Sequence, residues 1–201
     1  MITIVDYEMG NPKSIMNMLS RLGIKSQLSR NLSDISQASK LILPGVGAFD
    51  AAMRNLKKFD LINPLNKKAL EEKIPILGIC LGMQVLTNSS EEGSEKGLGW
   101  IDAQTKKFDS SLGIKVPHMG WNYVAPKTNS PICKELNHKS RFYFVHSYYV
   151  QTNNDQNSCM KSNYSIEFDS AVQNYNIYGV QFHPEKSHKF GMQILKNFSE
   201  L

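Results

Sequence analysis

The chain of 201 residues is 41% hydrophobic and 20% charged, which is typical of a globular protein that buries a sizeable core. No apolar run approaches the roughly 20 residues that cross a bilayer, and the N-terminal segment does not resemble a secretory signal. The net charge of +5 is dispersed among acidic residues, and no nucleic-acid-binding motif accompanies it. We therefore expect a single domain over residues 1–201 in the cytoplasm, with neither a membrane nor a nucleic acid as partner.

The three cysteines are too few and too scattered for a disulfide framework or a zinc site; they are Cys80, Cys133 and Cys159. This usage agrees with a reducing compartment. We expect no metal and no cofactor.

The first half of the chain alternates apolar strands with amphipathic helices. Strands are expected over residues 2–6, 25–29, 41–43 and 74–79, and helices over 14–22, 48–58 and 61–73. Ser14 is expected to cap the first helix and Gly23 to end it. Continuous apolar strands alternating with helices indicate a mostly parallel sheet that is covered on both faces.

The second half has shorter and more antiparallel strand patterns. Segments 100–108 and 114–116 are expected to form a hairpin at the sheet edge, followed by strands at 142–145, 158–167, 170–173 and 177–182 and by a helix from about Ser187. The predicted fold is an open, mostly parallel α/β sheet with helices on both faces and an antiparallel extension. The carboxyl ends of its strands should meet at one edge, where a site is expected.

Residues 74–84 (IPILGICLGMQ) are typical of a strand, a tight turn and a helix. Gly78 and Gly82 allow the strand and the helix to approach closely, so that Cys80 is raised above the sheet beside free backbone N–H groups. This position favours a thiolate nucleophile. The alternative is a buried structural cysteine in a strand-to-helix turn.

A cysteine nucleophile needs a base and a group that orients the base. His183 and Glu185 supply both at the end of the last strand, and residues two apart on an extended segment point to the same side. We therefore interpret Cys80, His183 and Glu185 as a catalytic set. His146 lacks a neighbouring carboxylate, so it is interpreted as structural or substrate-lining.

The segments GICLGMQ (78–84) and QFHPE (181–185) resemble the class I glutamine amidotransferases, whose triad is Cys, His and Glu in that order. Four further segments resemble, within that family, the glutaminase subunits of imidazole glycerol phosphate synthases of histidine biosynthesis: PGVG (44–47), PHMGWN (117–122), YFVHSY (143–148) and GVQFHPEKS (179–187). The resemblance extends along the whole chain and implies a flavodoxin-like fold.

The resemblance implies that Cys80 attacks the side-chain amide of L-glutamine and that His183 exchanges the protons. The oxyanion would be held by backbone N–H groups of Leu81 and of Val46 or Gly47. The substrate would be bound by Gln84, Glu92, His146, Ser147 and Tyr148. The alternatives are an ordinary strand-to-helix turn at 44–47, a solvent-facing Gln84, and a plain acidic loop at Glu91 and Glu92.

The implied product, ammonia, needs a covered route to a second protein, because bulk water would protonate it. The resemblance implies a (β/α)8-barrel cyclase as the partner in a heterodimer. The candidate docking residues are Asn11, Met119, Trp121, Asn122 and Lys186. Core packing of Met119 and Trp121 and a solvated Lys186 are the alternatives. We also expect the glycine-rich loop 44–47 to keep its oxyanion donor misaligned until the partner is bound.

Two other functions remain open at this point. A paralogous glutaminase subunit would use the same chemistry to supply ammonia for surface-sugar amidation, with an N-acetyl sugar as acceptor. A non-catalytic α/β binding protein would not need Cys80, His183 and Glu185 together.

Overall fold

The computed structural model describes residues 1–127 and 130–201. Its eleven-stranded main sheet follows the order β2-β1-β3-β4-β13-β12-β10-β6-β5, and β11 and β8 extend it from β12. The strands in chain order are β1 (Ile2–Val5), β2 (Ser26–Ser29), β3 (Leu41–Leu43), β4 (Ile76–Ile79), β5 (Ser89–Ser90), β6 (Ala103–Lys107), β8 (Ala125–Pro126), β10 (Tyr148–Thr152), β11 (Ser158–Tyr164), β12 (Ile166–Asn174) and β13 (Ile177–Val180).

The sheet has a parallel part and an antiparallel part. Strands β2, β1, β3, β4 and β13 pair in parallel. Strand β12 runs antiparallel to β13, and β10, β11 and β6 continue this extension. The predicted mostly parallel sheet with an antiparallel extension is therefore confirmed.

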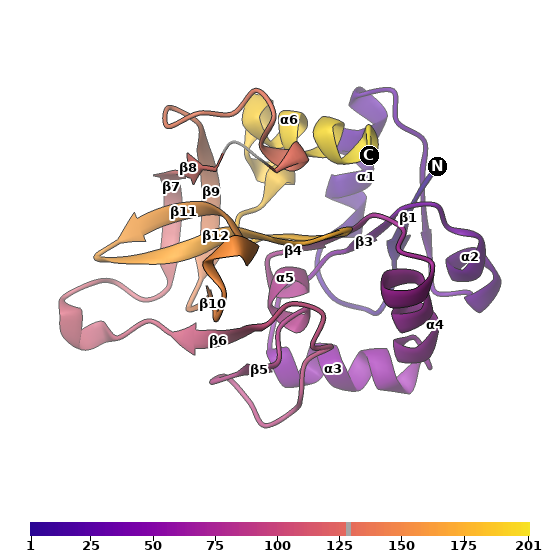
Figure 1. The fold of residues 1–201 in the computed structure, drawn as a ribbon, viewed down its shortest axis with the longest axis horizontal. Helices are drawn as coiled ribbons and strands as arrows, with labels where there is room; N and C mark the ends of the chain where they lie inside the picture. Colours follow the sequence, from indigo (N-terminus) through magenta and orange to yellow (C-terminus); the bar gives the residue numbers. More distant parts are fainter. Residues whose placement is uncertain (128–129) are drawn as a thin grey trace.

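Helices cover both faces of the parallel part, with α1 and α6 on one face and α3 and α4 on the other (Figure 1). The α-helices are α1 (Pro12–Arg21), α2 (Leu32–Gln37), α3 (Phe49–Lys58), α4 (Ile62–Asn66), α5 (Leu81–Val85) and α6 (His188–Ser199). Successive side chains of a strand point to opposite faces of the sheet, so the core has two parts, one on each face. Ile2 and Ile4 pack in the cluster that includes residues of α1 and α6, whereas Val5 packs in the cluster that includes residues of α3 and α4.

A second sheet contains only β7 (His118–Tyr123) and β9 (Arg141–His146), which pair antiparallel with His118 opposite His146. Strand β9 leads directly toward β10 and so links the small sheet to the main one. Exposure alternates along β7, which shows that one face of the strand is turned inward and the other lies at the surface.

The structure corrects several sequence predictions. Asn11, not Ser14, caps α1, and its side chain accepts the Ser14 N–H at 3.3 Å, with Pro12 as the first helical residue. Segment 114–116 forms no strand, and the antiparallel partner of β6 is β10. The helix predicted over 61–73 ends sooner, as α4 followed by a π-helical turn (Lys67–Glu71), and helix α2 was not predicted.

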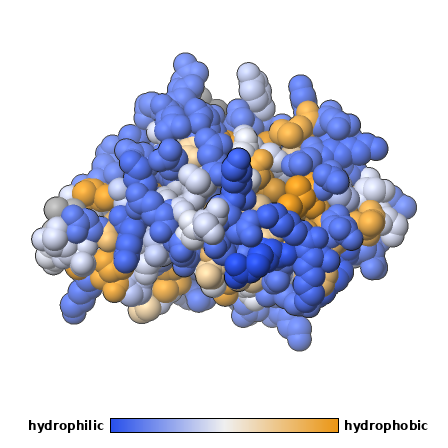
Figure 2. Space-filling model, turned by 90° about the horizontal axis from the view of Figure 1, so that it is seen from below, coloured by the Kyte–Doolittle hydropathy of each residue, from blue (hydrophilic) through white to orange (hydrophobic). Residues whose placement is uncertain are grey.

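The face of the molecule in Figure 2 is mainly hydrophilic, with apolar residues in small separate groups. This agrees with the dispersed charge of the sequence. Over the described part of the chain, no helix combines the length and the hydropathy of a membrane-spanning segment.

Candidate active site

Cys80 lies in the sharp turn between β4 and α5, with φ 55° and ψ −112°. A Cβ atom on Gly82 would lie 1.9 Å from the Leu43 carbonyl oxygen, and one on Gly78 would lie 2.4 Å from the Gly82 carbonyl oxygen. Both positions therefore require glycine because backbone approaches them too closely for any side chain. The close approach that the sequence predicts is confirmed, and it holds Cys80 in a strained conformation with positive φ.

The sulfur of Cys80 is in a polar but enclosed position, and the residue is only 6% exposed. Its Sγ accepts from the Gln181 side-chain amide at 3.8 Å and lies 4.0 Å from the Val145 carbonyl oxygen. The Cys80 N–H donates to the Val180 carbonyl at 2.8 Å, which ties the turn to the neighbouring strand β13.

His183 and Glu185 follow β13, the strand that pairs in parallel with β4. Nδ1 of His183 lies 2.7 Å from Oε1 of Glu185. The predicted contact is thus present, but its geometry differs from the prediction: residues Pro184–Lys186 form a 3₁₀ turn instead of an extended segment. The turn folds the carboxylate back onto the imidazole.

His183 is buried, and its pKa is raised from 6.5 to about 10. Burial alone acts in the opposite direction, but the thiolate of Cys80 and the carboxylate of Glu185 outweigh it by favouring the imidazolium. The Nε2 atom of His183 has no hydrogen-bond partner within the described part of the chain. Since the carboxylate fixes the proton on Nδ1, Nε2 is the atom available for proton exchange.

A cavity of about 370 Å³ opens at Cys80. It brings together most of the residues singled out from the sequence, and its walls are formed by Val46, Gly47, Cys80, Leu81, Gln84, Glu92, Pro117, Val145, His146, Ser147 and Tyr148. Pro117 and Val145 were not predicted individually, although both stand in motifs that carried the resemblance. Glu92 contributes a carboxylate to this lining, which suits a ligand with a positively charged group.

The segment 44–47 lies against the turn that holds Cys80. The Leu81 N–H donates to the Gly45 carbonyl at 3.3 Å, so this predicted oxyanion donor is already engaged. Gly47 has φ +114°, a conformation that an ordinary residue resists, and Val46 is exposed. In this arrangement the loop covers the N–H group that an oxyanion would need.

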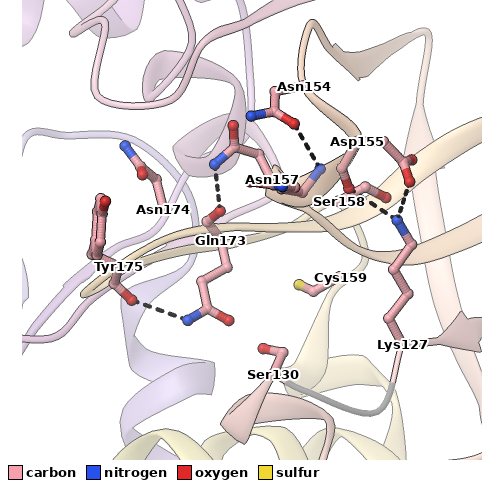
Figure 3. Close-up of a pocket in the computed structure, with 11 residues that line it drawn as sticks. Lys127, Ser130, Asn154, Asp155, Asn157, Ser158, Cys159, Gln173, Asn174 and Tyr175 are labelled. Carbon is pink, nitrogen blue, oxygen red and sulfur yellow. Dashed lines mark hydrogen bonds and ion pairs between the residues drawn. The ribbon is translucent and has the colours of Figure 1, made fainter.

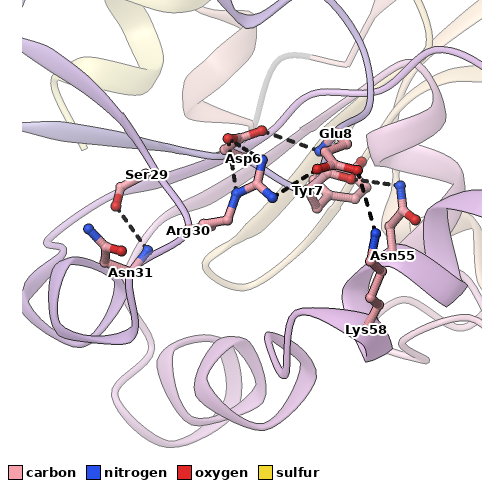
Figure 4. Close-up of polar contacts among 8 residues, drawn as sticks. All are labelled: Asp6, Tyr7, Glu8, Ser29, Arg30, Asn31, Asn55 and Lys58. Atoms are coloured by element: carbon pink, nitrogen blue, oxygen red, sulfur yellow. Dashed lines mark hydrogen bonds and ion pairs between the residues drawn. The ribbon is translucent and has the colours of Figure 1, made fainter.

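The loop that precedes α1 supports segment 44–47 from behind. The buried hydroxyl of Tyr7 donates to the Pro44 carbonyl. Asn55 donates to the Tyr7 carbonyl at 3.0 Å, and Arg30 pairs with Asp6 and Glu8 at 2.7 and 2.9 Å on either side of Tyr7 (Figure 4). These contacts fix the position of Tyr7 and, through it, the start of the segment.

Gln84 is buried, which excludes the solvent-facing alternative. Its side-chain amide donates to the Tyr148 carbonyl at 3.1 Å and to Oε1 of Gln181 at 3.2 Å. Glu92 accepts the Phe49 N–H at the start of α3 at 2.8 Å, whereas Glu91 accepts the Lys107 N–H away from the cavity. Of the two acidic residues, only Glu92 lines the cavity.

The candidate docking residues do not pack in the core. Met119 is 62% and Trp121 is 44% exposed, and both lie on the outer face of β7. Lys186 and Asn11 are also exposed, and Asn122 is half-buried. Tyr123, which is 57% exposed on the same face, was missed, although its spacing of two from Trp121 signals it.

A larger hollow of about 700 Å³ lies near the start of β11 and the end of β12, and five of its eleven lining residues carry amide side chains (Figure 3). Lys127 pairs there with Asp155 at 2.7 Å. None of the predicted site residues is among its described lining residues. Outside residues 128–129, no three His, Cys, Asp or Glu side chains are grouped as metal ligands would be.

A cysteine in a strained strand-to-helix turn, beside a His–Glu pair that directly follows the adjacent parallel strand, is the arrangement that the resemblance implied. Residues 3–200 match the model of the family Glutamine amidotransferase class-I. The chain belongs to this family of enzymes.

The relatives are more specific. The chain is 57% identical over 198 residues to imidazole glycerol phosphate synthase subunit HisH 2 of Methanococcus maripaludis, with 98% of each chain covered. It is 51% identical over 201 residues to the protein of the same name from Pseudomonas aeruginosa, with 100% of each covered. Among solved structures, PurLQS from Thermotoga maritima is similar with a TM-score of 0.74 at 19% identity over 98% of this chain and 96% of that chain, which shows the shared fold.

Proposed function

We propose that this chain is the glutaminase subunit of an imidazole glycerol phosphate synthase and hydrolyses L-glutamine to glutamate and ammonia. The observation that carries the proposal is the hydrogen-bonded His183–Glu185 pair beside Cys80, whose side chain lines a small cavity. Relatives at 57% and 51% identity that bear this name support it. One amidotransferase domain over residues 1–201, acting in the cytoplasm, is part of the proposal.

In the proposed mechanism His183 holds the proton of Cys80 as an imidazolium, which its raised pKa of about 10 favours at neutral pH. The thiolate attacks the side-chain carbonyl carbon of glutamine and forms a tetrahedral oxyanion. The C–N bond then breaks, and ammonia leaves with the proton from His183. Water, deprotonated by His183, hydrolyses the thioester to glutamate and restores the thiol. Glu185 keeps the imidazole oriented throughout.

The oxyanion requires a rearrangement of segment 44–47. If the peptide between Gly45 and Val46 turns over, the Gly45 carbonyl releases the Leu81 N–H and the Val46 N–H points toward the site. Two donors would then face the oxyanion. We propose that binding of the partner and its nucleotide drives this change, so that the isolated chain has little glutaminase activity.

Glutamine would bind along the cavity with its amino group near the carboxylate of Glu92. Its carboxylate would meet backbone groups of residues 146–148. The side chains of Gln84 and His146 are already hydrogen-bonded to the Tyr148 carbonyl, so they would act as the wall of the site.

The proposed partner is a (β/α)8-barrel cyclase. It would receive ammonia through a covered route and use it to form imidazole glycerol phosphate and an aminoimidazole carboxamide ribotide. The exposed side chains of Met119, Trp121 and Tyr123 suit an interface, and Lys186 and Asn11 are exposed as well. Asn122 would stand just beneath this surface.

The test is glutamate release from glutamine by the chain alone, with the cyclase, and with the cyclase and its nucleotide. Little turnover alone and a large gain with the loaded partner are expected, and Cys80→Ala should abolish the reaction. Equal turnover in all three conditions refutes the partner-dependent step. If a sugar-modifying synthetase, and not a barrel cyclase, co-purifies with the chain, the ammonia acceptor is a sugar.

A further inference from the structure

Two buried histidines outside the catalytic pair are linked to each other and to the cavity wall. Nδ1 of His118, on β7, lies 2.9 Å from Nε2 of His146, on β9. Nδ1 of His146 lies 2.7 Å from the Tyr148 carbonyl oxygen. At the other end, the side-chain amide of Asn122 lies 3.3 Å from Nε2 of His118.

Asn122, His118, His146 and the Tyr148 carbonyl form a hydrogen-bonded row. The donor and acceptor properties of these groups determine which nitrogen of each histidine carries a proton. A carbonyl oxygen only accepts, so His146 must carry its proton on Nδ1. Its Nε2 is then an acceptor, and His118 must donate from Nδ1. The Nε2 of His118 is left as an acceptor for the Asn122 amide, whose nitrogen also donates to the Asn163 carbonyl at 2.9 Å.

The surroundings keep both rings neutral, as this assignment requires. His118 is stacked between Phe144 and Tyr164, with ring centroids 4.9 and 4.1 Å away. Burial lowers the pKa of His118 to about 4, and burial together with the neighbouring His118 and His183 lowers that of His146 to about 3. Neither ring is positioned to take a proton near neutral pH.

The Tyr148 carbonyl is the point where this row reaches the cavity. It accepts hydrogen bonds from His146 and from the side-chain amide of Gln84. Gln84 also donates to Gln181, whose amide donates to the sulfur of Cys80. Ser147 and Tyr148 line the cavity, so the two donors hold that wall in place. The far end of the row, Asn122, lies on β7 between the exposed residues Trp121 and Tyr123.

We propose that Asn122, His118 and His146 form a one-way hydrogen-bond row that positions the Tyr148 wall of the cavity and connects it to the outer strand β7. His118 is then a positioning residue: it touches no substrate and acts through His146. The role for glutamine rests on the proposed glutaminase function. The assignment of protons to the two histidine rings does not depend on that function.

The proton arrangement is tested by nitrogen NMR of the full-length chain labelled in its histidine rings. Both His118 and His146 are expected as the Nδ1–H tautomer, with Nε2 unprotonated. Single variants assign the signals among the five histidines. A proton on Nε2 of His146 overturns the proposal, whatever the chain proves to catalyse.

The positioning role is tested by glutamine kinetics of the chain with its loaded partner. His118→Leu removes the donor, and the KM for glutamine is expected to rise about five- to tenfold, as for the loss of one buried hydrogen bond, with kcat within about twofold. His118→Asn places its amide nitrogen near the Nδ1 position and should restore most of the affinity. His138→Leu, at an exposed histidine, is the matched control.

Equal KM values for His118→Leu, His118→Asn and the parent chain overturn the positioning role. A fall in kcat alone, with KM unchanged, also contradicts it. If the parent chain does not hydrolyse glutamine at all, the proposed function fails while the NMR result still decides the proton arrangement. If His118→Leu does not fold, the comparison of His118→Asn with the parent chain and the tautomers carries the decision.

Discussion

Cys80 is held in a strained conformation with positive φ by contacts that exclude any side chain at positions 78 and 82. A residue that is not glycine adopts this conformation only when its surroundings enforce it. Here the enforcing contacts are backbone to backbone: the Leu43 carbonyl meets Gly82, and the Gly82 carbonyl meets Gly78. The reactive position of the thiol therefore depends on two residues that take no part in chemistry.

Gly82→Ala tests this dependence. The added methyl group would overlap a backbone carbonyl that cannot move freely, so we expect the free energy of unfolding to fall by about 1–3 kcal/mol or more and glutaminase activity to be lost. Urea unfolding and glutamate release measure the two effects. The matched variant Gly23→Ala has a positive φ but open space around it, and it should keep the activity despite a loss of about 1 kcal/mol.

The charge of His183 predicts a dependence on pH. Because its folded pKa is raised to about 10 from 6.5, the stability gained from its protonation is fully present below about pH 6.5 and is lost as pH rises through about 10. Glu185→Gln keeps an acceptor for Nδ1 but removes the negative charge. Its destabilisation relative to the parent chain should be largest near pH 7 and shrink by about pH 10.5.

Urea unfolding of both chains at several pH values measures this difference. Ring NMR should also show the His183 titration midpoint moving down in Glu185→Gln. A midpoint near the ordinary histidine value in the parent chain contradicts the assigned charge.

Among the helices and strands, the pattern of apolar and polar residues predicted the parallel strands well. It predicted the pairing of the later strands and the helix ends less well. Continuous apolar runs such as residues 41–43 are buried on both faces of the sheet, so they can be read directly. Residues 114–116 alternate Ile, Lys and Val, as an edge strand can, but they form no strand, because β6 pairs with β10, a partner distant in sequence. The cap of α1 was displaced because Asn11 precedes Pro12, which fixes the first helical turn.

The site was predictable where one side chain carries the chemistry. Cys80 and His183 are recognisable by type and spacing, whereas Glu92 was indicated only by the resemblance. The engaged Leu81 N–H and the His118 contact were not predictable, because they depend on backbone carbonyls and on the pairing of β7 with β9. The 3₁₀ turn at Pro184–Lys186 was also hidden, since a strand-end His-Pro-Glu is compatible with an extended chain.

We expect the position of segment 44–47 to depend on the hydrogen bond from Tyr7 to the Pro44 carbonyl. Tyr7→Phe removes the buried donor to the Pro44 carbonyl, which should lower the free energy of unfolding by about 1–3 kcal/mol and reduce partner-stimulated glutaminase activity about fivefold. Tyr175→Phe, at a tyrosine that is 87% exposed, is the matched control. Unchanged activity in Tyr7→Phe would mean that the segment is positioned without this anchor.

At the scale of the whole molecule, the sheet brings together ends of strands that are far apart in sequence, and the small β7–β9 sheet stands beside them. Its outer face carries Met119, Trp121 and Tyr123, while its inner face carries the histidine row. The same two strands therefore border both the proposed docking surface and the cavity wall. Through these two strands a bound partner would be connected directly to the proposed glutamine site.

Trp121→Ala tests the docking surface. Removing a large aromatic side chain from the centre of an interface is expected to weaken cyclase binding by about 2 kcal/mol, or about 30-fold, without a matching loss of stability. Titration calorimetry against the cyclase measures the effect. Leu70→Ala, at an exposed apolar residue of the π-helical turn, should bind normally; equal weakening by both would exclude this surface.

The proposed function depends on attack of the Cys80 thiol on the side-chain carbonyl carbon of glutamine. Its most direct test is peptide mass spectrometry after the chain, with its loaded partner, reacts with diazo-oxo-norleucine, a glutamine-analogue electrophile. One adduct on Cys80 is expected, slowed by His183→Ala and prevented by glutamine, while the buried Cys133 and Cys159 stay unmodified. Absence of an adduct on Cys80 in the folded protein, or equal labelling of all three cysteines, would contradict the role of Cys80 as the nucleophile.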